Sequence, residues 1–237
     1  MSNFKNQDFY FGISDNKIYI CFFDNEKNKL KESVNFDIPD SLNNNLNFKI
    51  ILDLLKQNVR KLEQKLNLFI NSGNISIQSK SFQSILYSVK DIYDDRELDK
   101  DVIIKLIRGA MQQFDNCEKN LTILHVIVNK YIVDNKVYVF FPNCKKFKKI
   151  VLELEFVCLN KILIHKVKNL FNECKIDIKK IVSYDYAKKF LDNIKDDTLC
   201  FSAHKILNGA NQSEVILTEN TLKKHNLFDK IFNFFDN

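Results

Sequence analysis

The sequence predicts an α+β protein, and three observations lead to this fold class. Phe9–Phe23 contains two apolar runs around a polar turn, which is typical of a β-hairpin. Phe48–Leu66 repeats Ile, Leu and Val at three- and four-residue steps, which is typical of an amphipathic helix. The later segments continue as strand, helix, two strands, helix and strand, so strands and helices are mixed along the 237 residues.

Each further element follows from its own pattern. The hairpin is expected to turn at Ser14–Lys17, where the residues favour turns. Ile150–Leu159 alternates apolar residues with glutamates, so one face of that strand is expected to be buried. The other expected strands are Lys31–Ile38, Leu68–Ile77 with an interruption at Asn71–Asn74, Leu121–Val133 and Ile176–Tyr184. The other expected helices are Asp99–Phe114, with an aspartate near its start, and Lys161–Cys174.

The chain from Asp192 to Asn220 has the weakest pattern. It combines a short helical stretch around Ala203–Leu207, a turn at Asn208-Gly209 and a short apolar run at Val215–Leu217. We therefore expect a tether in this region, leading to a terminal helix.

The C-terminal segment is unusually rich in phenylalanine. At about 100° per residue its apolar side chains fall on one face of a helix, with Lys230 among the polar residues. Such a face needs an apolar partner, which is a membrane surface, another protein or the protein's own core. Lysines nearby favour an anionic lipid surface. The predicted membrane-binding residues are Leu227, Phe228, Lys230, Ile231, Phe232, Phe234 and Phe235.

Composition narrows the class of protein only broadly. The formal net charge of +6 suits an anionic partner, either nucleic acid or lipid, without choosing between them. The six cysteines lie far apart without metal-binding spacing, which favours a reducing cytoplasm. The start of the chain lacks the apolar core of a signal peptide, and no apolar run reaches the ~20 residues of a membrane span.

Few residue patterns indicate catalysis. Four glycines could hardly form a phosphate-binding loop, and none of the standard glycine motifs is present. The four histidines lack a metal-binding partner, and His125, within a strand, is interpreted as structural rather than as a base. The acidic cluster Asp94–Asp101 is interpreted as a helix start and solvated loop. The basic run Lys145–Lys149 allows nucleic-acid contact, but a solvated loop between two strands explains it as well.

Several short motifs share their order with one protein family. They are Phe11–Lys17, Asn71–Ile75, Leu124–Ile127, Tyr131–Asp134 with Pro142 after it, Leu152–Glu155 and Lys168–Val182. Together they resemble the bacterial actin-like cell-division protein FtsA over roughly residues 9 to 191, and the terminal helix resembles that family's membrane-targeting helix. The resemblance implies part of an actin-like (ribonuclease H-like) lobe, subdomain 1A, with the small α+β subdomain 1C inserted into it.

The sequence also departs from that family. Gly12 and Ser14 replace the Asp and Gly of its first phosphate loop, and Val128 and Cys144 replace a proline and a glycine. Nothing resembling the second lobe, with its adenosine site, follows Ile181. The resemblance therefore implies a lost ATP site, no cofactor, no metal and no enzymatic activity. FtsZ binding, carried mainly by the second lobe in that family, is in doubt.

These observations combine into one organisation and one leading hypothesis. The expected units are 1–75 with 161–191 (subdomain 1A), 76–160 (the 1C-like insert), 192–220 (tether) and 221–237 (amphipathic helix). The leading hypothesis is a non-enzymatic division adaptor on the cytoplasmic face of the inner membrane at the division site. It would recruit divisome proteins, with FtsZ among the candidates, or copies of itself. The alternatives are a basic nucleic-acid-binding protein, a degenerate actin-like ATPase completed by a partner chain, and a pilus-assembly-type actin-like adaptor.

Overall fold

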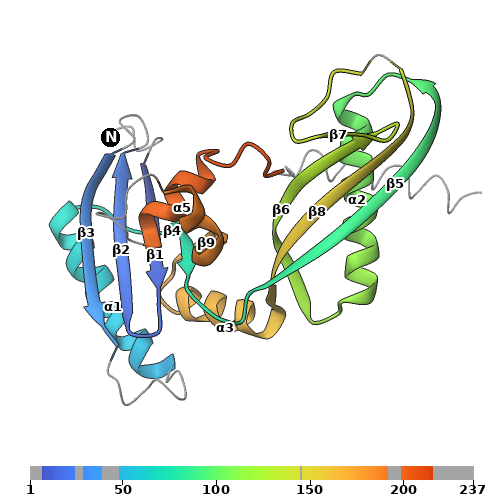
Figure 1. Cartoon of the computed structure of the whole chain (residues 1–237). Coiled ribbons are helices and arrows are strands. Elements are labelled where there is room, and N and C mark those ends of the chain that lie inside the picture. Colours follow the sequence, from blue (N-terminus) through green and yellow to red (C-terminus); the bar gives the residue numbers. More distant parts are fainter. Residues whose placement is uncertain (1–6, 25–28, 39–47, 145, 192–198, 216–237) are drawn as a thin grey trace, which may run out of the picture.

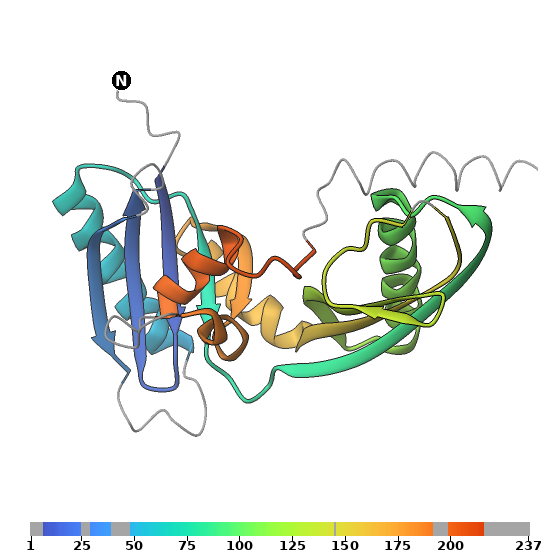
Figure 2. The same cartoon turned by 45° about the horizontal axis from the view of Figure 1, so that its top comes forward.

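The described part of the chain forms two β-sheets, each with its own helices. In the computed structural model, described for residues 7–24, 29–38, 48–144, 146–191 and 199–215, the two sheets lie side by side along an elongated molecule (Figure 1). The larger sheet has five strands in the order β3-β2-β1-β4-β9, and the smaller has four in the order β5-β8-β6-β7. Strand β9 is the edge of the larger sheet nearer the smaller one, and helix α5 packs on β1 and β4 of the larger sheet (Figures 1 and 2).

The element boundaries agree with most of the expected ranges. The strands are β1 (Gln7–Ile13), β2 (Lys17–Asp24), β3 (Lys29–Asp37), β4 (Ser72–Ile77), β5 (Gln83–Arg96), β6 (Leu121–Val133), β7 (Lys136–Tyr138), β8 (Phe147–Asn160) and β9 (Asp177–Ser183). The helices are α1 (Phe48–Leu66), α2 (Lys100–Cys117), α3 (Lys161–Asn172), α4 (Tyr184–Ala187) and α5 (Leu199–Leu207), with a short 3-10 turn at Lys188–Phe190. The predicted hairpin, the third strand and the helix over Phe48–Leu66 are confirmed.

The central strands of the five-stranded sheet are buried on both faces. Strands β1, β2 and β3 pair antiparallel, whereas β4 pairs parallel with both β1 and β9. Phe11 and Ile20 point to the face covered by α1 and α3, where Phe11 meets the ring of Phe171 edge-on at 4.8 Å. Tyr10 and Phe23 point to the opposite face, which is covered by α5. Side chains buried on both faces explain why β1 and β2 are nearly continuous apolar runs.

Helix α5 corrects the prediction of a tether over residues 192–220. Leu199, Cys200, Ala203 and Ile206 are buried, and the Cys200 thiol donates to the Tyr10 carbonyl at 3.3 Å. Residues 199–215 therefore belong to the folded body, because the Tyr10 and Phe23 face of the sheet needs an apolar cover. Residues 192–198 and 216–220, the rest of the predicted tether, lie outside the described residues.

The strands of the four-stranded sheet all come from the part of the sequence between β4 and α3. Helix α2 packs on one face of it, and its first turn is capped by Asp99, which accepts from the Val102 N–H at 2.8 Å. Edge strand β5 was not predicted from the sequence. Its signal is the alternation of Ile85, Tyr87 and Val89, which are half-buried, with exposed residues between them.

Two further local predictions were wrong. Ser72–Asn74, most of the expected interruption at Asn71–Asn74, is part of β4, which begins at Ser72. Gly73 allows the close approach of β1, since an added Cβ would lie 2.6 Å from the Phe11 ring. The basic run is not entirely a loop, because β8 already begins at Phe147. That ring is 1% exposed and packs near Tyr93, so it cannot serve as a stacking platform for bases.

Candidate functional site

The turn between β1 and β2 is closed by its own polar groups. The Ser14 N–H donates to the Lys17 carbonyl at 2.9 Å, and the Ser14 hydroxyl accepts from the Lys17 N–H at 3.1 Å. Just before the turn, an added Cβ on Gly12 would lie 2.8 Å from the Cβ of Leu199. The start of α5 therefore packs against Gly12, which aligns with the first phosphate loop of the FtsA family in the resemblance described above.

The two sheets are joined through a buried histidine. His125, on β6, is 3% exposed, and its Nε2 accepts from the Ser183 N–H at 3.2 Å, at the end of β9. Its Nδ1 lies 2.7 Å from Oε1 of Glu214. Because a backbone N–H can only donate, Nε2 is the unprotonated nitrogen, and Nδ1 carries the proton that is donated to Glu214. Both ring nitrogens are engaged, which suits the structural role inferred for His125 from the sequence.

Tyr186 completes this network from α4. Its hydroxyl donates to Oε2 of Glu214 at 2.8 Å and accepts from Nδ2 of Asn211 at 2.7 Å. Burial is the main cause that raises the pKa of Tyr186 far above its ordinary value, so the phenol remains a neutral donor. We call His125, Ser183, Tyr186, Asn211 and Glu214 the joint. Its members come from both sheets and from the segment that follows α5.

The segment after α5 is held on β6 by backbone hydrogen bonds as well. The Val128 N–H donates to the Ser213 carbonyl at 2.9 Å, and the Val215 N–H donates to the Val126 carbonyl at 2.8 Å. Beside it lies a cavity of about 160 Å³ between the two sheets. The cavity is lined mainly by apolar residues, which include Met111, Ile123, Leu124, Val126, Ile181, Ile206, Leu207 and Val215.

A second feature lies at the far end of the small sheet. Strands β6 and β7 are joined by a tight turn at Asp134 and Asn135, whose φ angles are 46° and 69°, the pair of positive values that a type I′ turn requires. The Asp134 carboxylate accepts from the N–H groups of Lys148 and Lys149 at 3.1 Å and 2.9 Å, and ties this turn to β8. The loop after β7 is thereby anchored at its base.

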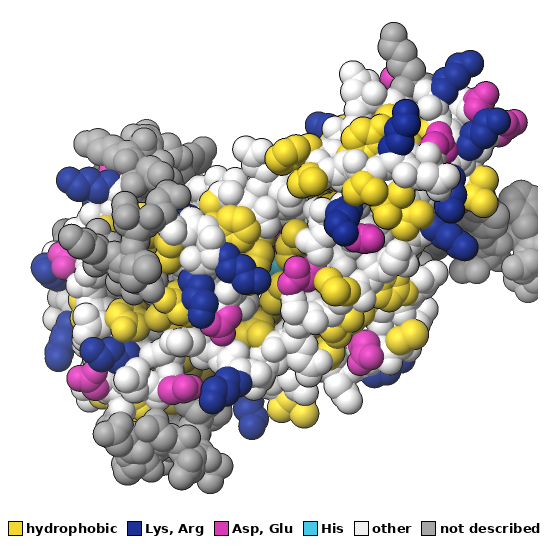
Figure 3. All heavy atoms as spheres, in the orientation of Figure 1, with side chains coloured by type: hydrophobic (Ala, Val, Ile, Leu, Met, Phe, Trp, Pro, Cys, Tyr) yellow, Lys and Arg dark blue, Asp and Glu magenta, His cyan; other side chains and the backbone are white. Residues whose placement is uncertain are grey.

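Large apolar side chains of β7 and its loop are exposed to solvent. Val137 and Val139 are each 60% exposed, Phe140 is 71% exposed and Phe141 is 42% exposed. We call these four residues the tip patch. Figure 3 shows hydrophobic side chains at this end of the molecule among Lys, Asp and Glu side chains.

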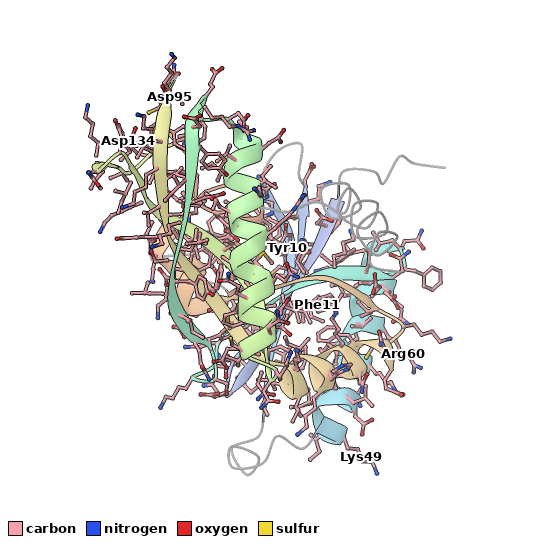
Figure 4. All side chains as sticks on the ribbon, turned by 90° about the vertical axis from the view of Figure 1, so that its right-hand side faces the viewer. Tyr10, Phe11, Lys49, Arg60, Asp95 and Asp134 are labelled. Atoms are coloured by element: carbon pink, nitrogen blue, oxygen red, sulfur yellow. The ribbon has the colours of Figure 1, made fainter. Side chains whose placement is uncertain are left out.

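Charges of both signs surround the tip patch. Lys136 and Lys148 are exposed near it, and Asp95 and Asp134 lie at the same end of the small sheet (Figure 4). An apolar centre with a polar rim of mixed charge is the usual composition of a protein–protein contact surface. The sequence analysis did not single out these residues. Their signal was the apolar run Val137–Phe141 within a segment that otherwise indicates a turn.

The other predicted site residues are not tested by the described chain. Leu227, Phe228, Lys230, Ile231, Phe232, Phe234 and Phe235 all lie outside the described residues. Within the described ranges, no three His, Cys, Asp or Glu side chains gather as a metal site would require. In that same part of the chain, every helix is too short or too polar to span a bilayer.

Comparisons with known proteins give distant structural matches only. No protein-family model and no curated protein matches the sequence. One similar solved chain is described as the PilM-PilN type IV pilus biogenesis complex, with a TM-score of 0.42 and 9% identity over 76% of this chain and 48% of that one. Another is a Bacteroides thetaiotaomicron protein described as having an actin-like ATPase fold and unknown function, with a TM-score of 0.31 and 12% identity over 80% of this chain and 58% of that one. The chain thus spans roughly half the length of these proteins.

Proposed function

We propose that this protein is a non-enzymatic adaptor that binds a protein partner through the tip patch. The observation that carries the proposal is the exposure of Val137, Val139, Phe140 and Phe141 at the anchored end of the small sheet. Burying a large apolar side chain contributes about 1.5–3 kcal/mol, so a partner covering the two phenylalanines gains several kcal/mol before the costs of association. The mixed charges at the rim would then set orientation and specificity.

The tip patch can be tested without disturbing the fold. Phe140→Ser removes an exposed ring, and Phe69→Ser is a matched control because Phe69 is 89% exposed and belongs to the other sheet's unit. Tagged full-length variants are crosslinked in the native cells, and the captured proteins are compared. We expect Phe140→Ser to lose specific crosslinked bands that wild type and Phe69→Ser retain. Identical bands in all three proteins would refute the tip patch as the binding surface.

We extend the proposal to a membrane tether and a place in cell division. The supporting observations are the apolar face of Leu227–Phe235 and the resemblance to FtsA in the order of motifs. The proposed location is the cytoplasmic face of the inner membrane at the division site. Liposomes with anionic lipid should pellet the full chain but not a chain that ends at Asn220. Equal pelleting would remove the tether from the proposal.

The position of the protein in cells separates the two adaptor hypotheses. A fluorescent band at mid-cell supports a division adaptor with divisome partners, whereas foci at the pilus machinery support the pilus-assembly alternative. A diffuse or nucleoid signal contradicts both. Whether FtsZ is among the partners is tested by adding purified FtsZ filaments to the protein and measuring co-sedimentation.

We also propose that the protein neither binds nor hydrolyses ATP. The support is the contact of Leu199 with the face of Gly12 and the closure of the Ser14–Lys17 turn by its own hydrogen bonds. A phosphate group needs free backbone N–H donors at such a turn, and the Ser14 and Lys17 donors are already used. Isothermal titration with ATP and Mg²⁺ should give no heat of binding. Saturable binding, alone or with a partner chain, would favour the degenerate ATPase hypothesis.

A further inference from the structure

Strand β5 is a long edge strand. It comprises Gln83–Arg96 and, within the described part of the chain, pairs on one side only, with β8. In Figure 1 it forms the outer border of the small sheet. An edge of this length presents a row of backbone donors and acceptors that readily pair with another strand.

The direction of those backbone groups follows from the other side of β8. The Lys149 N–H donates to the Asp134 carboxylate at 2.9 Å, and the Lys149 carbonyl accepts from the Asp134 N–H at 3.0 Å. Neither backbone group of Lys149 is therefore directed toward β5. Ile92 faces Lys149 in the register, and its own N–H donates to the Asp91 side chain at 2.9 Å. Because backbone directions alternate along a strand, Ser88 and Lys90 also direct their N–H and carbonyl groups outward, away from β8.

The side chains of β5 are unusual for an edge. Leu86 is 75% exposed and Ile92 is 72% exposed, while Val89 between them is half-buried on the α2 side. Leu86 and Ile92 stand on the open face of the sheet, three positions before and three positions after Val89. Edge strands normally carry charges at such positions to prevent pairing. On this open face, Lys90 is the charged residue between the two exposed apolar ones.

We propose that two copies of this chain pair through β5, antiparallel, about a two-fold axis at Val89. In this register Leu86 faces the partner's Ile92, and Ile92 faces the partner's Leu86. The two-fold axis therefore creates two identical apolar pairs, and each exposed apolar residue is covered by one from the partner. Lys90 faces the partner's Ser88, and Asp91 faces the partner's Tyr87. The two four-stranded sheets become one continuous sheet with both α2 helices on the same face.

Neighbouring registers are less favourable. An axis at Lys90 places two lysines opposite each other, and an axis at Asp91 places two aspartates opposite each other. An axis at Ser88 places Leu86 opposite a lysine. The pattern fits a second copy better than an unrelated peptide, because only a strand with the same spacing covers Leu86 and Ile92 together. This inference does not depend on the tip patch.

The oligomeric state of the full-length protein tests the proposal. Light scattering after size exclusion and sedimentation velocity should show a dimer that dissociates on dilution. Leu86→Lys and Ile92→Glu should each weaken the dimer about ten-fold or more, since each removes both apolar pairs. The double variant should regain the dimer, because each lysine then faces a glutamate across the axis. Phe69→Ser and Phe140→Ser should leave it unchanged.

A second variant acts on the backbone. Ser88→Pro removes an N–H that faces away from β8, so the fold is retained while the edge is blocked. A wild-type protein that stays monomeric would overturn the proposal, as would a dimer insensitive to all these variants. Loss of the dimer in the single variants without recovery in the double variant would overturn the register about Val89. None of these results bears on partner capture by the tip patch, which is measured separately.

Discussion

Replacing His125 with alanine should weaken the whole structure, because this residue joins the two sheets. The change leaves the Ser183 N–H without its acceptor and removes the Nδ1 donor from the Glu214 carboxylate. Losing a hydrogen bond to a charged group typically costs about 1.5–3 kcal/mol, and leaving a buried N–H without an acceptor costs about 1–3 kcal/mol. Glu214 keeps its bond from Tyr186, and its side chain is 11% exposed, which favours the lower end. We expect a loss of about 3 kcal/mol.

The assay is urea unfolding followed by circular dichroism, together with thermal melting. For a chain of this size, about 3 kcal/mol corresponds to a melting temperature lower by about 6–12 °C. Hydrogen exchange adds a local measure. The amides of Val128 and Val215, which hold residues 213–215 on β6, should lose more protection than amides in β2. His125→Gln should restore part of the stability, since an amide can still donate to Glu214.

The matched control is an exposed ion pair that also involves β6. Lys130 of β6 and Glu153 of β8 lie 3.0 Å apart, with side chains 50% and 42% exposed. Lys130→Ala should cost only about 0–1 kcal/mol, because solvent screens such pairs. If His125→Ala is as mild as Lys130→Ala, the joint does not stabilise the fold and the argument from its buried hydrogen bonds is wrong.

Three further predictions concern other parts of the fold. Gly12→Ala should lower the free energy of unfolding by about 1–3 kcal/mol, because the new Cβ meets Leu199 at 2.8 Å. Gly109→Ala, whose new Cβ would have no atom within 4 Å, should instead stabilise α2 by about 0.5–1 kcal/mol. The urea unfolding midpoints of both variants measure this contrast. The hydrogen bond from the Val102 backbone N–H lowers the pKa of Asp99. The capping contribution to stability is therefore present above about pH 4, the pKa in the unfolded chain, and is lost as the pH falls through the lower pKa of the folded state. Asp99→Ala should cost about 1 kcal/mol of unfolding free energy at pH 7 and nothing measurable in acid. Burial lowers the pKa of His204, so the folded state prefers the neutral ring and stability should fall as pH drops below about 6.5; His204→Phe should flatten that part of a stability–pH curve, and an unchanged slope would contradict it.

Local patterns predicted most helices and strands correctly. The boundaries of α1 match the expected helix, and β6 matches the expected strand, because each has a clear period and clear flanking residues. Asp99 was expected near a helix start and is the residue that caps α2. Strand β5 was missed, although its alternation is present in the sequence, because the polar and acidic residues within it also suit a loop.

The joint and the tip patch could be predicted from the sequence only in small part. His125 was expected to be structural, but its partners Ser183, Tyr186 and Glu214 lie 58 to 89 residues away along the chain. No periodicity links residues so far apart. The tip patch likewise depends on exposure, which the type of residue alone cannot reveal.

The sequence by itself determined the local elements of this protein, because hydrophobic period, capping residues and turn residues act over a few neighbours. The continuous apolar runs of β1 and β2 also indicate that both faces of the first sheet must be covered by other elements. Only the tertiary structure decided that α5 supplies this cover, that His125 meets Glu214, and that β5 is left at an edge. Those outcomes depend on which distant segments pack together. That packing is set by the burial of whole faces rather than by any local pattern.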